Sequence, residues 1–129
     1  MPPLPLSYAI DTALGVIRIV VVGGATAEEQ TRLAEAWAAD PLYEPGMPIL
    51  LDNRRREEVA SSAHIREMAD LTKSSQVLEQ GTRCAVVVAS EVEFGLTRMY
   101  ATLAEGGPME TRVFRDIDRA ESWLTGKSE

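Results

Sequence analysis

Two stretches of this chain consist almost entirely of apolar, mostly β-branched residues, and they constrain the fold more than any other feature. Val16 to Val22 is interrupted only by Arg18, and Arg83 to Ala89 is a nearly continuous apolar run. A strand that lacks polar alternation is buried on both faces, which is typical of the central strands of an α/β sheet. The chain is therefore predicted to fold around a sheet that is covered by helices.

A hairpin is predicted at the start of this sheet. Leu6 to Asp11 alternates loosely between apolar and polar residues, and Ala13 to Gly15 has the composition of a turn. Two short strands joined by a tight glycine turn are typical of a β-hairpin. Two further strands are expected at Pro48–Leu51 and Glu110–Phe114.

Helices are predicted between and after these strands. Thr26 with Glu29, and Ser90 with Glu93, have the spacing of a capping box, which marks a helix start. The expected helices end near Asp40 and Glu105. Two more are expected at Ser62–Ser75 and Ile117–Leu124. The apolar stripes expected to face inward are Leu33, Ala34, Trp37 and Ala38; Ile65, Met68, Leu71 and Thr72; and Val92, Leu96, Met99 and Leu103.

The order of these elements predicts the fold class. A hairpin followed by α-β-α-β-α-β-α implies a single α/β domain with a mixed, mostly parallel sheet of four to five strands and packed helices. The domain is expected over residues 6–125, with a flexible proline-rich segment at 1–5 and a tail at 126–129.

Composition limits the function classes. The 129 residues carry a net charge of −7, which argues against nucleic acid as a partner because phosphate backbones select basic surfaces. No apolar run approaches the roughly 18 residues that a membrane span needs. The single cysteine, Cys84, excludes an internal disulfide and fits a cytoplasmic protein, and the single histidine, His64, excludes a histidine-rich metal site. No cofactor motif is present.

A charged loop follows the strand that ends at Leu51. Asp52, Asn53, Arg54, Arg55 and Arg56 stand where the carboxyl end of a strand meets the next helix, the edge of an open α/β sheet that usually carries function. The arginines are candidates for binding a protein partner through guanidinium forks. The alternatives are that the charges are only solvated and that Asp52 pairs with the loop arginines.

The helix that follows this loop opens with Ser61 and Ser62. Either serine is a candidate phosphoacceptor, because the helix dipole favours negative charge at that position; the alternative is a plain N-cap. A hydrolytic pair of Ser62 with His64 is a third and weaker hypothesis, since no G-x-S-x-G motif accompanies it. No residue is assigned a catalytic role.

The segment Phe94 to Tyr100 is unusual because Gly95 lies early in a predicted helix, where glycine costs about 1 kcal/mol relative to alanine. A close approach by a neighbouring backbone or a ligand would explain it. Phe94, Arg98 and Tyr100 are accordingly candidates for lining a shallow ligand pocket, with core packing of the aromatic residues as the alternative.

Over nearly the whole chain, from Tyr8 to Leu124, the sequence resembles the STAS/SEC14-like group of bacterial proteins similar to the anti-sigma-factor antagonist SpoIIAA. The resemblance rests on ILLD (49–52), RCAVVVAS (83–90), FGLTRMY (94–100) and VFRDIDRAESWL (113–124). It implies a sheet of four or five strands that is backed by helices.

The resemblance also implies two functions. In the antagonists a partner kinase phosphorylates a serine at the start of the helix after the third strand, and Ser61 and Ser62 match that place. Ala60 and Ala63 stand where the antagonists carry aspartate and glycine. The leading hypothesis is a non-enzymatic domain that binds a protein partner or itself as a homodimer. The alternative, from the SEC14 side, is a binder of a small lipophilic ligand.

Overall fold

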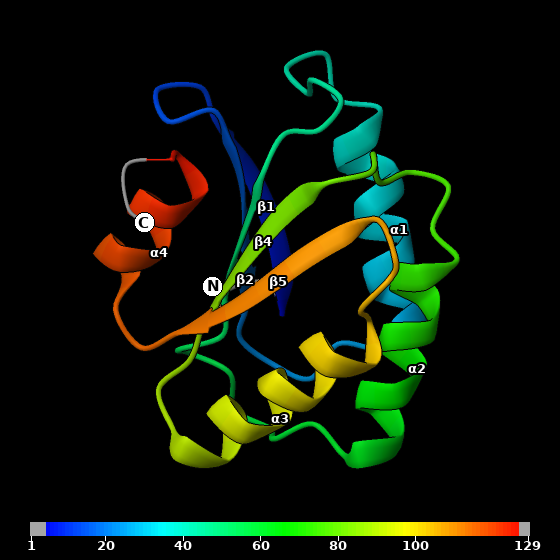
Figure 1. The fold of residues 1–129 in the computed structure, drawn as a ribbon, viewed down its shortest axis with the longest axis vertical. Helices are drawn as coiled ribbons and strands as arrows, with labels where there is room; N and C mark the ends of the chain where they lie inside the picture. Colours follow the sequence, from blue (N-terminus) through cyan, green and yellow to red (C-terminus); the bar gives the residue numbers. More distant parts are fainter. Residues whose placement is uncertain (1–4, 127–129) are drawn as a thin grey trace.

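Five strands form one mixed sheet in the described part of the chain, which comprises residues 5–126 of the computed structural model (Figure 1). The strands are β1 (Leu6–Asp11), β2 (Val16–Val21), β3 (Ile49–Asp52), β4 (Thr82–Val87) and β5 (Met109–Phe114), and their order in the sheet is their order in the chain. Only β1 and β2 pair antiparallel, and every other neighbouring pair is parallel. The predicted fold class is therefore confirmed. The expected flexible residues 1–4 and tail residues 127–129 lie outside the described part.

The helices are α1 (Ala27–Ala38), α2 (Ser62–Lys73), α3 (Glu91–Leu103) and α4 (Ile117–Leu124). From β2 to β5, each new strand is added on the same side of the previous one. Right-handed connections between these parallel strands therefore place α1, α2 and α3 on the same face of the sheet. The helix after β5 is free of that constraint, and α4 covers the opposite face (Figure 1). All predicted elements are present, with ends that differ by about two residues at most, as helix and strand ends commonly do.

Local signals explain where the elements begin. Gly15 has a φ of +72°, which turns the hairpin, and the Asp11 carboxylate accepts the Leu14 N–H at 3.0 Å. Thr26 and Glu29 form the predicted capping box of α1 through two reciprocal bonds of 3.1 and 3.0 Å. Only half of the second predicted capping box, at the start of α3, is present. The Ser90 side chain accepts a hydrogen bond from the Glu93 N–H, but the Glu93 carboxyl accepts none from the Ser90 N–H.

Each face of the sheet has its own core. Along β4, Cys84 and Val86 pack with Trp37 of α1, whereas Ala85 and Val87 pack with Trp123 of α4. This alternation confirms that the central strands are buried on both faces. The two clusters are separated by the sheet itself.

The predicted inward stripe of α3 is wrong. Val92 is 61% exposed and Leu103 is 39% exposed, while Thr97 is buried. The helix lies at the end of the sheet against α2 and β5, and it presents a face rotated by one residue from the predicted one. The buried residue on that face, Thr97, has a small polar side chain, so a pattern of hydrophobic residues could not identify it.

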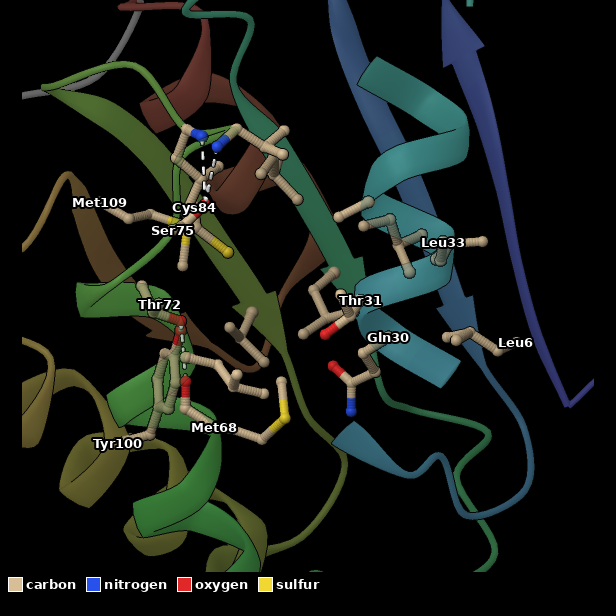
Figure 2. A pocket seen from close by; sticks show the side chains of 18 of the residues that line it. Leu6, Gln30, Thr31, Leu33, Met68, Thr72, Ser75, Cys84, Tyr100 and Met109 are labelled. Atoms are coloured by element: carbon tan, nitrogen blue, oxygen red, sulfur yellow. Dashed lines mark hydrogen bonds between the residues drawn. The ribbon is translucent and has the colours of Figure 1, made fainter. Parts of the chain in front are cut away.

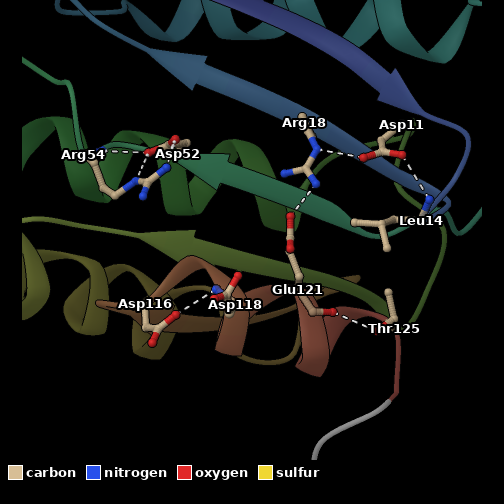
Figure 3. A network of polar contacts seen from close by, with 9 residues as sticks. All are labelled: Asp11, Leu14, Arg18, Asp52, Arg54, Asp116, Asp118, Glu121 and Thr125. Carbon is tan, nitrogen blue, oxygen red and sulfur yellow. Dashed lines mark hydrogen bonds and ion pairs between the residues drawn. The ribbon is translucent and has the colours of Figure 1, made fainter.

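An ion-pair network joins the hairpin to α4 (Figure 3). Arg18 of β2 donates through Nε to Asp11 at 3.0 Å and through Nη2 to Glu121 of α4. Hydrogen bonds from the Leu14 amide and from Arg18 lower the pKa of Asp11. Arg18, the polar residue that interrupts the apolar run of β2, is therefore used to attach α4 to the sheet.

Candidate functional site

A cavity of about 380 Å³ lies between α1 and α2, above the sheet (Figure 2). It is within the range of about 300–1,000 Å³ that small-molecule sites occupy. Its floor is formed by Ile19, Ile49 and Val86 of the central strands. The side walls come mainly from two helices and are mostly apolar: Leu33, Ala34 and Trp37 of α1, and Ile65, Met68, Leu71 and Thr72 of α2.

Hydrogen bonds join the α1 and α2 segments to other neighbouring elements. On one side, Tyr8 of β1 donates a hydrogen bond of 2.9 Å to Asp40, just after α1. On the other side, the Thr72 hydroxyl of α2 bonds to the Tyr100 hydroxyl of α3. The predicted inward stripe of α2 is confirmed only in part, because Thr72 is buried and Ile65 and Met68 are half-buried. Leu71 is instead 37% exposed. The stripe lines the cavity and does not pack closely against α1.

Two buried ionisable groups that line the cavity are uncharged. Burial raises the pKa of the Cys84 thiol to about 12. Burial, followed by the neighbouring Cys84, also raises the pKa of Tyr100. Both groups stay protonated at physiological pH, so the deep part of the cavity suits an apolar ligand.

One end of the cavity is polar. Asn53, Arg56 and His64 line it at the carboxyl end of β3 and the start of α2. Asn53 is only 9% exposed, and its backbone N–H donates to the Val87 carbonyl at 2.9 Å. The side-chain Oδ1 of Asn53 is buried and has no hydrogen-bond partner within residues 5–126. The cavity thus combines apolar walls with a polar group at the sheet edge where open α/β domains bind ligands.

The predicted arginine loop divides into three different roles. Arg54 donates from Nε and Nη2 to the two oxygens of Asp52 at 3.0 and 2.9 Å, and this hydrogen bonding lowers the pKa of Asp52 (Figure 3). Arg55 is exposed. Arg56 is half-buried, donates from Nε to the Glu58 carbonyl at 2.7 Å and lines the cavity. The interpretation that Asp52 pairs with a loop arginine is confirmed, and the three arginines do not form one surface cluster.

The two serines are also distinguished by the structure. Ser61 is the N-cap of α2, and its Oγ accepts the His64 N–H at 3.1 Å. Ser62 is the first residue of the helix and is exposed. The His64 imidazole lies 4.0 Å from Glu67, and among the described residues no hydrogen bond joins it to Ser62. The geometry does not assemble the hydrolytic pair.

The three residues predicted to line one pocket on α3 do not share a pocket. Phe94 and Arg98 line a second, open pocket of about 440 Å³ against β5, whereas Tyr100 lines the cavity between α1 and α2. Six residues at about 100° each place Tyr100 on a different side of the helix from Phe94. The Phe94 ring is instead covered by Arg115, whose guanidinium carbon lies 3.8 Å from the ring centroid.

Gly95 is not explained by a close approach within the described chain. It is exposed, and a Cβ built on it would meet no atom within 4 Å. This expectation was wrong for the folded domain itself, since the helix face at this position is open. The same open face carries the exposed Val92.

Two further features of the described residues bear on the kind of site. Residues 5–126 contain no group of three or more histidine, cysteine, aspartate or glutamate side chains that could hold a metal ion. In the same range no helix is both long enough and apolar enough to span a membrane.

The cavity was missed by sequence analysis, although several of its residues were named. Leu33, Ala34 and Met68 were predicted as ordinary core positions, and nothing in their spacing distinguishes a packed stripe from one that borders a cavity. The signal that was available is Asn53, a polar residue placed directly after a buried strand. It was assigned to a partner-binding loop and not to an internal site.

The domain consists of a hairpin, a run of parallel strands and helices on both faces of the sheet. Solved structures with the same arrangement are known. One that matches is an uncharacterized protein from the DUF3478 family with a SpoIIAA-like fold, from Shewanella loihica PV-4. The two chains are 20% identical, the match covers 92% of this chain and 91% of that chain, and the TM-score is 0.60. No protein-family model and no curated protein matches the chain. The chain therefore has a SpoIIAA-like fold, as the sequence resemblance implied.

Proposed function

We propose that this protein is a non-enzymatic binding domain for a small lipophilic ligand, which is held in the cavity between α1 and α2. The cavity carries the proposal: about 380 Å³ of space that is walled by Leu33, Met68 and other apolar side chains and closed below by the sheet. Apolar walls with a few convergent polar groups are what small-molecule sites share. This was the alternative hypothesis from the sequence.

The leading sequence hypothesis, a partner-binding arginine loop, has less support from the geometry. Arg54 is exposed but paired with Asp52, and Arg56 lines the cavity, so Arg55 is the exposed arginine of the triplet that enters no ion pair within residues 5–126. An isolated surface charge contributes little to an interface.

A regulatory modification remains a second candidate, because one observation favours it. Ser62 is exposed at the first position of α2, while Ser61 is occupied as the N-cap. If a kinase modifies this helix start, Ser62 is the acceptor, and its phosphate would lie beside the end of the cavity that His64 lines. Phosphopeptide mapping of protein from its own host tests this, and a phosphate on Ser61 would contradict it.

The proposed function is tested by thermal unfolding of delipidated protein against a panel of straight-chain compounds. A ligand that saturates the folded state at 100 times its Kd stabilises it by about 2.7 kcal/mol, or roughly 8–13 °C for a chain of this length. We expect such a shift for at least one compound, with one molecule bound in a native mass spectrum. A panel that leaves Tm unchanged and a protein that carries no ligand when isolated would contradict the proposal.

A further inference from the structure

We infer that the ligand of this cavity is a medium-chain amphiphile with a carboxylate head, which is bound by Arg56 and Asn53 at the carboxyl end of β3. The inference rests on the proposed function and specifies the chemistry of its ligand. It follows from three features of the polar end of the cavity: an unpartnered amide, an available guanidinium and the dipoles of the helix starts.

The Asn53 side chain is the first feature. It is 91% buried, and in the described structure its Oδ1 bonds to nothing. An unsatisfied buried polar group costs about 1–3 kcal/mol, so the Asn53 amide would gain from a hydrogen-bond partner bound beside it in the cavity that it lines. Rotating the carboxamide of Asn53 by 180° exchanges the positions of Oδ1, an acceptor, and Nδ2, a donor. Asn53 can therefore present Nδ2 to an anionic oxygen.

The second feature is the Arg56 guanidinium. Its Nε is used by the Glu58 carbonyl, and within residues 5–126 its terminal nitrogens enter no ion pair. Glu93 of α3 acts on Arg56 electrostatically but forms no ion pair with it in the same range. Arg54, two residues earlier, already has Asp52 as its counter-ion. A ligand carboxylate would give Arg56 the same kind of partner through charge-assisted hydrogen bonds.

The third feature is the field of the helices. Because α1, α2 and α3 each follow a parallel strand, all three begin at the edge of the sheet where Asn53 lies (Figure 1). Helix starts carry partial positive charge. Glutamates in the first turns of α1 and α3 offset it, whereas the first turn of α2 holds no acidic residue and contains His64. The start of α2 is therefore the helix start here whose partial positive charge is not offset by a carboxylate of its own first turn, and it favours an anion beside it.

The other end of the cavity fixes the orientation and length of the tail. Figure 2 shows Cys84, Ser75 and Met109 at the end away from Met68 and Gln30, and the Cys84 thiol there is uncharged. An apolar cavity of about 150 Å³ holds a benzene ring, so about 380 Å³ accommodates roughly fifteen non-hydrogen atoms. Dodecanoate is of this size, with its carboxylate at Arg56 and its tail directed toward Cys84.

The test compares three probes that share one tail: dodecanoate, dodecanol and dodecylamine. Each is titrated calorimetrically into delipidated full-length protein at neutral pH, the two ionic probes below their micellar concentrations and dodecanol below its solubility limit. We expect dodecanoate to bind at least 10-fold more tightly than dodecylamine. Equal or tighter binding of the amine or the alcohol would overturn the carboxylate inference while leaving the lipophilic site intact. If none of the three binds, the proposed function itself fails.

Two matched variants locate the head group. Arg56→Gln removes the charge that lines the cavity, and Arg55→Gln removes the exposed charge beside it. A charge-assisted hydrogen bond of about 1.5–3 kcal/mol predicts that Arg56→Gln weakens dodecanoate about 10- to 100-fold. The same variant should change dodecanol binding by less than about threefold, and Arg55→Gln should leave dodecanoate binding unchanged. Equal losses in both variants would contradict the assignment, and the ranking of probes on the wild-type protein holds even if Arg56→Gln does not fold.

Discussion

Filling the cavity from one wall should stabilise the empty protein and abolish ligand binding at the same time. Ala34 of α1 is half-buried and lines the cavity, so Ala34→Leu adds three carbon atoms to that space. In a closely packed core the same change would cost about 1–3 kcal/mol through overpacking. Whether Ala34→Leu raises or lowers the free energy of unfolding therefore shows whether the cavity is present in the protein.

The magnitude follows from the area that the new side chain buries. A fully buried methylene contributes about 0.8 kcal/mol, which gives about 2.4 kcal/mol for three carbons. The cavity is open on one side, so the gain should be about 1–2 kcal/mol in the free energy of unfolding. For a chain of this length that corresponds to a rise of roughly 3–10 °C in Tm.

The assay is urea unfolding of delipidated protein, followed by far-UV circular dichroism, with dodecanoate titration of the same samples. Ala36→Leu is the matched control, because Ala36 lies on the exposed side of the same helix and does not line the cavity. The control should change stability by less than about 0.5 kcal/mol and leave binding intact. Destabilisation by Ala34→Leu, or dodecanoate binding that survives it, would refute the reasoning.

Three further predictions concern helix starts and exposed positions. Gly95→Ala should stabilise the protein by about 1 kcal/mol in urea unfolding, because alanine favours the helix and the new Cβ meets open space; a loss of stability would show that the folded domain itself constrains this position. Ser61→Ala should cost about 1 kcal/mol through loss of the cap, whereas Ser62→Ala should change stability by less than about 0.5 kcal/mol; equal costs would contradict the assignment. Glu93→Gln should stabilise the protein at pH 7, because burial raises the pKa of Glu93 above its usual 4.5 and so disfavours the folded carboxylate. That gain should disappear below about pH 4.5, where Glu93 is protonated in both states, and a gain that persists there would point to packing.

The order of the elements could be predicted from the sequence because several signals agreed. The apolar run at Val16–Val22 and the capping box at Thr26 are local features that the tertiary structure leaves intact. The strand order follows from the same succession once crossovers are right-handed. The inward face of α3 could not be predicted, because Thr97 is the buried residue there and Val92 is exposed.

The site was less predictable than the fold for a physical reason. A cavity depends on how several elements pack together, and here Tyr8 bonds to Asp40, just after α1, while Thr72 bonds α2 to α3. Neither hydrogen bond has a signature in the sequence. Asn53 and Arg56 were identified as candidates from their position after a strand, but their direction into the cavity depends on how the loop folds.

Methyl NMR of the delipidated protein during titration with dodecanoate tests the cavity as a ligand site most directly. The account predicts shifts of the methyl resonances of Leu33, Ile65 and Met68, which line the cavity. It predicts unchanged resonances for Val87 and Leu124, which pack on the α4 face of the sheet. Shifts confined to Val87 and Leu124, or no shifts at saturating dodecanoate, would contradict the account.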